Sequence, residues 1–258
     1  MTAPLSTRTP AVAAAPQSPG PIPFSRLVRV EWAKATDTRA ARWLLALVVA
    51  TTAGLMLVPI LAPTTFDQTA ASYLRVAALG LAVPLPVVAI LIFTGEWSQR
   101  SIITTFTQEP RRIRVVNAKL AVSVLLGVAG AVGGGVVTAA GVGLAAVAGR
   151  DLATNLSIGV VAGYVIFVLL NVLAAVALGA LLQNSAAAIA ASFALPMSLA
   201  IVGTASTWVA NWIDLSVWEW VLSNEWDGHL LQISVSVAFW VVVPLAAGVI
   251  RTQRRDVG

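Results

Sequence analysis

The chain has 258 residues, of which 58% are hydrophobic and only 10% are charged, and its net charge is +5. A soluble domain carries about 25% charged residues, so this composition excludes an ordinary soluble protein and predicts an all-α, polytopic membrane protein. The lack of cysteine excludes disulfides, thiolate nucleophiles and cysteine metal sites. The basic residues flank apolar runs, which indicates contact with lipid headgroups rather than with nucleic acid.

The N-terminal part contains a predicted tail and a predicted amphipathic helix. Residues 1–23 hold six prolines and no apolar run, which is typical of a disordered tail. Residues 24–42 predict a helix that lies in the membrane interface with Trp and Phe on its apolar side. The alternative is a solvated extension of the first span. The predicted apolar stripe consists of Phe24, Leu27, Val28, Glu31, Trp32 and Ala35.

Six apolar runs follow, each near the ~20 residues that a transmembrane helix needs. Lys and Arg divide 14 to 2 between the two sets of connections, so the positive-inside rule places both termini in the cytoplasm. The loop 95–119, the turn 183–185 and the basic tail 251–258 then lie on the same side. The arginine- and alanine-rich composition suggests a bacterial plasma membrane. The predicted spans are 43–61, 76–94, 120–148, 158–182, 186–204 and 233–250.

Residues 207–227, between spans five and six, hold five of the nine tryptophans, four acids and no base. Tryptophan prefers the headgroup level of a bilayer. This pattern predicts short helices in, or dipping into, the outer leaflet. A plain aromatic anchor belt is the alternative.

The loop 95–119 is a polar island between two apolar runs. Glu96 and Arg100 are four residues apart with the acid first, which favours a helical ion pair. An apolar face follows, and Pro110 ends the helix. This short helix either receives force from an outside protein or is an ordinary interfacial helix whose arginines touch lipid phosphates. The candidate contact residues are Glu96, Arg100, Ser101, Ile102, Ile103, Phe106, Pro110, Arg111 and Arg112, with Gln183 and Asn184 in the second turn.

Several kinds of chemistry are missing from the sequence. No Asp or Glu lies inside the six predicted spans, which disfavours an ion-coupled transporter. No phosphate-binding loop G-x-x-x-x-G-K-[ST] occurs, so the chain has no ATP site of that kind, and no HExxH or GxSxG motif indicates an enzyme. Prolines inside spans two and five free backbone groups that can face a cavity. The predicted substrate path is therefore lined by Pro84, Pro86, Asn171 and Pro196, although Asn171 can also serve as an interhelical hydrogen-bond partner.

The third apolar run is rich in glycine. Gly130 and Gly134 form a small-xxx-small spacing that lets two helix backbones approach closely. We expect this spacing to serve packing within the chain rather than a subunit interface.

The sequence resembles the membrane (permease) subunit of ABC exporters of the type-2 permease family, from about residue 24 to residue 255. The resemblance is most specific at 95–119: an acid after span two (Glu96), a turn into a short helix, a proline (Pro110), an arginine pair (Arg111, Arg112) and Lys119. Arg100 departs from the glycine that is common at its position.

The resemblance implies that residues 101–108 form a coupling helix that docks on a separate ATPase subunit, with 183–185 as a smaller contact. It implies that residues 207–227 are external re-entrant helices. It also implies a permease dimer, formed by two copies or by a paralogue, whose substrate path follows spans one, two and five. ATP and Mg would be bound by the ATPase, and no cofactor by this chain.

The apolar path favours a lipid, drug or amphipathic peptide as substrate. Two other functional classes stay open: an ATP-independent secondary transporter or channel, and a permease-like scaffold or sensor.

Overall fold

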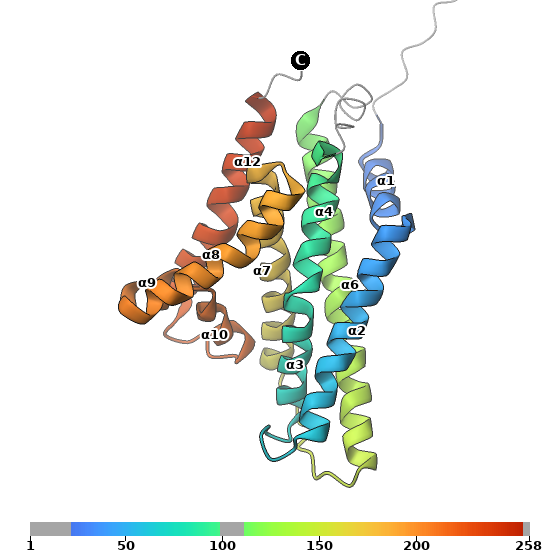
Figure 1. The fold of residues 1–258 in the computed structure, drawn as a ribbon, viewed down its shortest axis with the longest axis vertical. Helices are drawn as coiled ribbons and strands as arrows, with labels where there is room; N and C mark the ends of the chain where they lie inside the picture. The colour runs from blue at the N-terminus through green and yellow to red at the C-terminus, as the bar shows by residue number, and fades with distance from the viewer. Residues whose placement is uncertain (1–21, 99–110, 255–258) are drawn as a thin grey trace, which may run out of the picture.

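A computed structural model describes residues 22–98 and 111–254, and these residues are almost entirely helical (Figure 1). The predicted tail 1–23 lies mostly outside the described residues, as does the segment 99–110. The described elements are α1 (Phe24–Asp37), α2 (Arg39–Leu61), α3 (Ala70–Ala82), α4 (Pro84–Ser98), α6 (Arg112–Val147), α7 (Ile158–Leu182), α8 (Ser185–Ala205), α9 (Thr207–Trp212), the 3-10 turn η1 (Leu215–Trp218), α10 (Glu219–Leu222), α11 (Leu230–Val237), the π-helical turn η2 (Ala238–Val242) and α12 (Val243–Arg254).

The prediction of six membrane-length helices is confirmed for the described residues. They are α2, α3 with α4, α6, α7, α8, and α11 through α12. The helices run further than the apolar runs that predict them. The second span begins at Ala70 rather than at 76, because Thr69 caps the helix by accepting a hydrogen bond from the backbone N–H of Ser72. Arg75 therefore lies inside a helix and not in the preceding loop.

The prolines act differently in the four spans that carry them. α2 continues through Pro59. Span two is interrupted at Val83, directly before Pro84 and Pro86, which cannot donate to the helical ladder. α8 continues through Pro196 without a break. In the last span a π-helical turn directly precedes the helix that contains Pro244. Of these prolines, those in span two divide a membrane helix into two segments.

The core forms around α7, which packs against α3, α4, α6, α8 and α12. The glycines of α6 make close contacts possible, as expected for packing within the chain. A Cβ on Gly130 would meet Leu85, and a Cβ on Gly134 would meet Tyr164 and Leu81. By contrast, α8 contributes only Ala188 to the buried residues, so it lies at the margin of the bundle.

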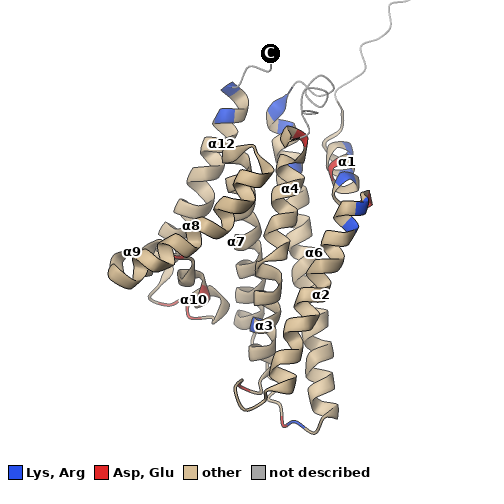
Figure 2. Cartoon of the chain, in the orientation of Figure 1, with Lys and Arg blue, Asp and Glu red and all other residues tan. Residues whose placement is uncertain are grey.

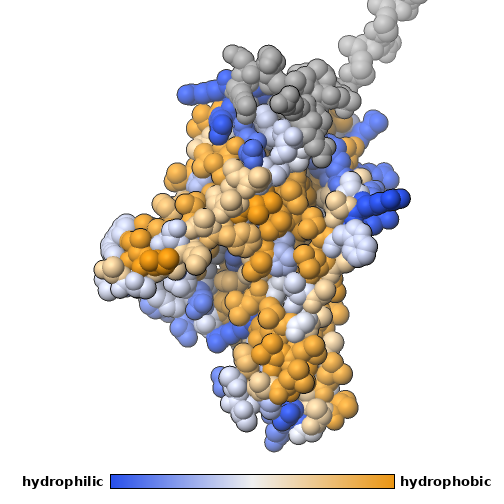
Figure 3. Space-filling model, in the orientation of Figure 1, coloured by the Kyte–Doolittle hydropathy of each residue, from blue (hydrophilic) through white to orange (hydrophobic). Residues whose placement is uncertain are grey.

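Most of the described basic residues gather at one end of the bundle. Figure 2 shows Lys and Arg positions at the end that carries α1, the start of α6 and the end of α12. We call this the basic end. Figure 3 shows an apolar surface between this end and the hydrophilic tip opposite to it. α6 has 36 residues and is about 54 Å long, so it exceeds a hydrocarbon core of about 30 Å and its basic first turns extend beyond it.

Residues 207–227 contain short helices, as predicted: α9, η1 and α10. They lie beside α7 and α11, away from the basic end (Figure 1). Trp218 and Val221 of this segment are only 1% exposed. The segment is therefore anchored to the bundle by buried side chains.

Candidate functional site

Four charged side chains from three helices form one ion-pair network at the basic end. Lys119 of α6 places its Nζ 2.7 Å from a carboxylate oxygen of Glu31 and 3.1 Å from one of Glu96. Lys34 completes the network, with its Nζ 2.8 Å from Glu31 and 2.6 Å from Glu96. Each acid contacts both lysines of the chain, so α1, α4 and α6 are held together at one point.

The network is buried on one side and open on the other. The side chain of Lys119 is 3% exposed and that of Glu31 is 6% exposed, whereas that of Lys34 is 45% exposed. Burial lowers the pKa of Lys34, but hydrogen bonds to Glu31 and Glu96 and their negative charges outweigh it, so its pKa is raised above the ordinary lysine value. Lys34 therefore stays protonated at physiological pH. Charges this deep are tolerated because they are paired.

The network corrects one expectation from the sequence. Lys119 does not face lipid headgroups, because it is buried between α1, α4 and α6. The predicted stripe of α1 also divides: Glu31 and Ala35 are buried, whereas Phe24 and Trp32 are 44% and 37% exposed. Glu31 and Ala35 therefore pack against the bundle, whereas the aromatic side chains of Phe24 and Trp32 stay partly exposed.

The turn between α7 and α8 is bonded to the end of α4. The Ser185 hydroxyl lies 2.8 Å from the hydroxyls of both Thr94 and Ser98, and the Ser185 backbone N–H donates to Ser98. Asn184 is exposed and caps α8 by accepting from the Ala187 backbone N–H. The described end of α4, up to Ser98, and the turn 183–185 are thus neighbours at the basic end.

The same turn is also bonded to α12. Gln183, which adopts a left-handed backbone conformation with φ of 52°, donates from Nε2 to the Thr252 hydroxyl at 2.9 Å. Arg112 at the start of α6 donates to the Thr252 carbonyl at 3.0 Å. Gln183 is 6% exposed, so its side chain is buried between the turn and α12.

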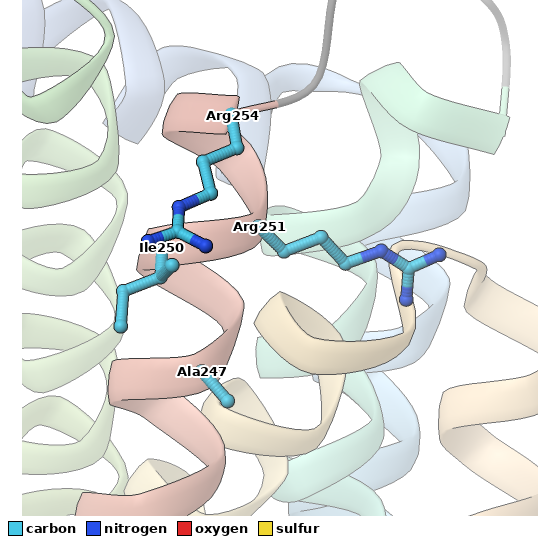
Figure 4. A pocket seen from close by; sticks show the side chains of 4 residues that line it. All are labelled: Ala247, Ile250, Arg251 and Arg254. Atoms are coloured by element: carbon cyan, nitrogen blue, oxygen red, sulfur yellow. The ribbon is translucent and has the colours of Figure 1, made fainter.

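Two arginines of α12 point in different directions. Arg251 reaches toward the turn between α7 and α8 and donates to the Leu181 carbonyl at 2.6 Å (Figure 4). Arg254 lies along α12 beside Ile250 (Figure 4). The ends of α4, α6, α7 and α12 are therefore connected by hydrogen bonds at the basic end.

Part of the predicted contact set falls outside the described residues: Arg100, Ser101, Ile102, Ile103, Phe106 and Pro110. The expected Glu96–Arg100 ion pair therefore also lies outside the described residues. Of the described members, Arg111 is exposed at the start of α6, and Glu96 contacts Lys34 and Lys119. The segment 99–110 is thus flanked on both sides by residues bonded into the bundle.

Three of the four predicted path residues line one small cavity. Pro86, Asn171 and Pro196 surround a space of about 50 Å³ between α4, α7 and α8. Pro84 lines a separate groove between α2 and the α3–α4 break. Asn171 donates from Nδ2 to the Phe167 carbonyl of its own helix at 2.9 Å, so the expected interhelical hydrogen bond is not formed within the described residues.

The residues 22–98 and 111–254 hold no cluster of three or more His, Asp or Glu side chains that could bind a metal ion. Comparisons with protein-family models and with curated proteins returned no match for this chain. The case for a function therefore depends on the residues and geometry described above.

One feature of the sequence indicates that Glu31 needs a partner, although the sequence analysis did not predict the network. Glu31 is the only charge on the apolar stripe of α1, and Lys119 is one of only two lysines. A lone charge on an otherwise buried face requires a partner of opposite charge. That rule predicts a pairing for Glu31, but it does not say which helix supplies the lysine.

Proposed function

We propose that this chain is the transmembrane permease subunit of an ATP-driven exporter of the ABC type-2 kind. A separate ATPase subunit binds ATP and Mg and docks at the basic end, through the segment 99–110 and the turn at Asn184. Two permease subunits carry a hydrophobic or amphipathic substrate out across the bacterial plasma membrane. The chain itself performs no catalysis.

The observation that carries the proposal is the bonding on both sides of the segment 99–110. Ser98 before it is bonded to Ser185, and Arg112 after it is bonded to Thr252. A force applied to this segment therefore reaches α4, α6, α8 and α12 directly. A chain without its own phosphate-binding loop needs such a connection to be driven by a partner.

The break at Val83 supports a movement of α4. Because α3 and α4 do not form one continuous helix, α4 can tilt at the break while α3 stays packed against α2 and α6. Lys119 ties α4 to α6 and α1, so these three segments move together at the basic end. Closure of the ATPase subunits would then widen the space between α4, α7 and α8.

The distribution of charge supports the orientation. The described basic residues lie mainly at one end, with the end of α12 beside the start of α6 (Figure 2). The positive-inside rule places this end in the cytoplasm. The segment 207–227 then faces the outer leaflet as re-entrant helices, and the marginal α8 lies where a second permease subunit would pack.

The test is an affinity purification of the tagged chain in mild detergent from its native cells, with the co-purifying proteins identified by mass spectrometry. We expect a stoichiometric subunit that carries a phosphate-binding loop. Phe106→Asp should abolish its co-purification, because a charge replaces an apolar docking side chain.

Phe66→Asp is the matched control, since it makes the same change in the half-buried connection between α2 and α3, at the opposite end of the bundle. Co-purification should survive this change. A chain that purifies alone, under conditions that preserve known complexes, would contradict the proposal and favour an ATP-independent function. Equal loss from both variants would show that the effect is unfolding and not docking.

A further inference from the structure

A second cavity lies at the other side of Asn171, far from the basic end. It measures about 400 Å³, a volume typical of ligand sites, and is formed by α3, α7 and the segment from η1 to α10. Its polar lining includes Arg75, Asn171, Trp218 and Glu219, and its apolar lining includes Phe167 and Leu222. None of these residues takes part in the contacts of the basic end.

The charges in this cavity are open to a ligand. Within the described part of the chain, neither Arg75 nor Glu219 forms an ion pair or a side-chain hydrogen bond, although both line the same space. Arg75 lies in the second turn of α3, inside a candidate membrane span, where an unpaired arginine is costly. Figure 2 shows a basic residue on α3 and acidic residues around α10, away from the basic end. The cavity therefore presents one positive and one negative group that are not neutralised by each other.

We propose that this cavity binds the headgroup of a zwitterionic amphiphile, such as a phospholipid that carries a phosphate and an ammonium group. The phosphate pairs with the exposed Arg75, and the ammonium pairs with the exposed Glu219. The chain of the amphiphile extends over Leu79, which is 53% exposed on α3, toward the surrounding lipid. A purely anionic headgroup would meet the Glu219 carboxylate unfavourably.

The neighbouring small cavity gives this site a connection to the rest of the bundle. Asn171, Leu215 and Trp218 line both spaces, and the small one continues to Pro86 of α4 and Pro196 of α8. A headgroup bound at Arg75 therefore contacts the wall of the space that the proposed tilt of α4 would widen. The placement of the site in the outer leaflet depends on the proposed orientation, whereas binding itself does not depend on export.

The test measures lipid binding to the purified chain by native mass spectrometry, using phosphatidylethanolamine, phosphatidylglycerol and free phosphoethanolamine as probes. We expect phosphatidylethanolamine to bind best. Arg75→Gln should weaken it by about tenfold or more, because a hydrogen bond between charged groups is lost. Glu219→Gln should weaken phosphatidylethanolamine and leave phosphatidylglycerol unchanged or tighter. Arg75 and Glu219 are both exposed, so both variants keep the fold.

Arg254→Gln at the basic end is the control and should leave phosphatidylethanolamine binding unchanged. Unchanged binding in Arg75→Gln, or equal binding of the two lipids in the native chain, would overturn the proposal. Free phosphoethanolamine that binds as tightly as the lipid would show a soluble ligand instead of an amphiphile. No ATPase subunit is present in this measurement, so its failure leaves the docking proposal standing, and a failed co-purification leaves this site standing.

Discussion

Replacing Lys119 with methionine is the most direct test of the buried ion-pair network. Methionine keeps a similar side-chain volume and removes the charge that contacts Glu31 at 2.7 Å and Glu96 at 3.1 Å. Glu31 is then a carboxylate with 6% exposure whose remaining partner is Lys34. Removing one member of a buried pair costs about 3–5 kcal/mol, because the other charge stays in a medium of low dielectric. That loss is a large fraction of a typical unfolding free energy of about 5–15 kcal/mol.

The assay is unfolding of the purified chain in a fixed detergent at pH 7.5, followed by tryptophan fluorescence. Lys34→Met makes the same chemical change at a side chain that is 45% exposed, and it should cost no more than about 1 kcal/mol. The double variant Lys119→Met/Glu31→Gln should recover part of the loss, because no lone charge remains buried beside α6. Equal destabilisation by the two lysine variants, or a double variant as unstable as the sum of its parts, would refute the reasoning.

Three further predictions concern packing, hydrogen bonding and orientation. Gly134→Leu should prevent normal folding, judged by expression and monodispersity in detergent, because its Cβ would meet Tyr164 and Leu81, whereas Gly133→Leu, with open space at the Cβ, should be tolerated. Thr252→Val should lower the unfolding free energy by about 1–3 kcal/mol by leaving buried Gln183 without this acceptor, while Thr204→Val, exposed on α8, should change it by less than about 0.5 kcal/mol. Because the native chain has no cysteine, the single variants Asn184→Cys and Asp227→Cys can each be labelled in intact cells. A membrane-impermeant maleimide should label only Asp227→Cys. Labelling of Asn184→Cys alone would show that the proposed orientation is inverted.

The sequence predicted the membrane helices well because an apolar run of about 20 residues leaves few alternatives. The six apolar runs predicted the number and order of the six membrane-length helices. The glycine spacing in α6 also predicted packing within the chain, which the close approaches of Leu85 and Tyr164 confirm. The tryptophan-rich stretch predicted the short helices of 207–227.

The helix ends and the partners of charged residues were harder to predict. Hydropathy placed Arg75 outside span two, but the cap at Thr69 starts the helix earlier and brings Arg75 inside it. Helical periodicity placed Glu31 on a face of α1 but could not say that Lys119, 88 residues later, would meet it. Such pairings depend on how distant helices pack, and one chain's local pattern does not contain that information.

The pairing of Glu31 with Lys119 also determines when, during synthesis of the chain, α1 can make its buried contact with α6. Ribosomes deliver α1 well before α6, so Glu31 reaches the membrane surface 88 residues ahead of its closest buried partner. During that interval Lys34, three residues away on the same helix, can already pair with this acid. The buried contact of Glu31 with α6 therefore forms only after the third span begins to insert, whereas the Lys34–Glu96 pair with α4 needs only the first two spans.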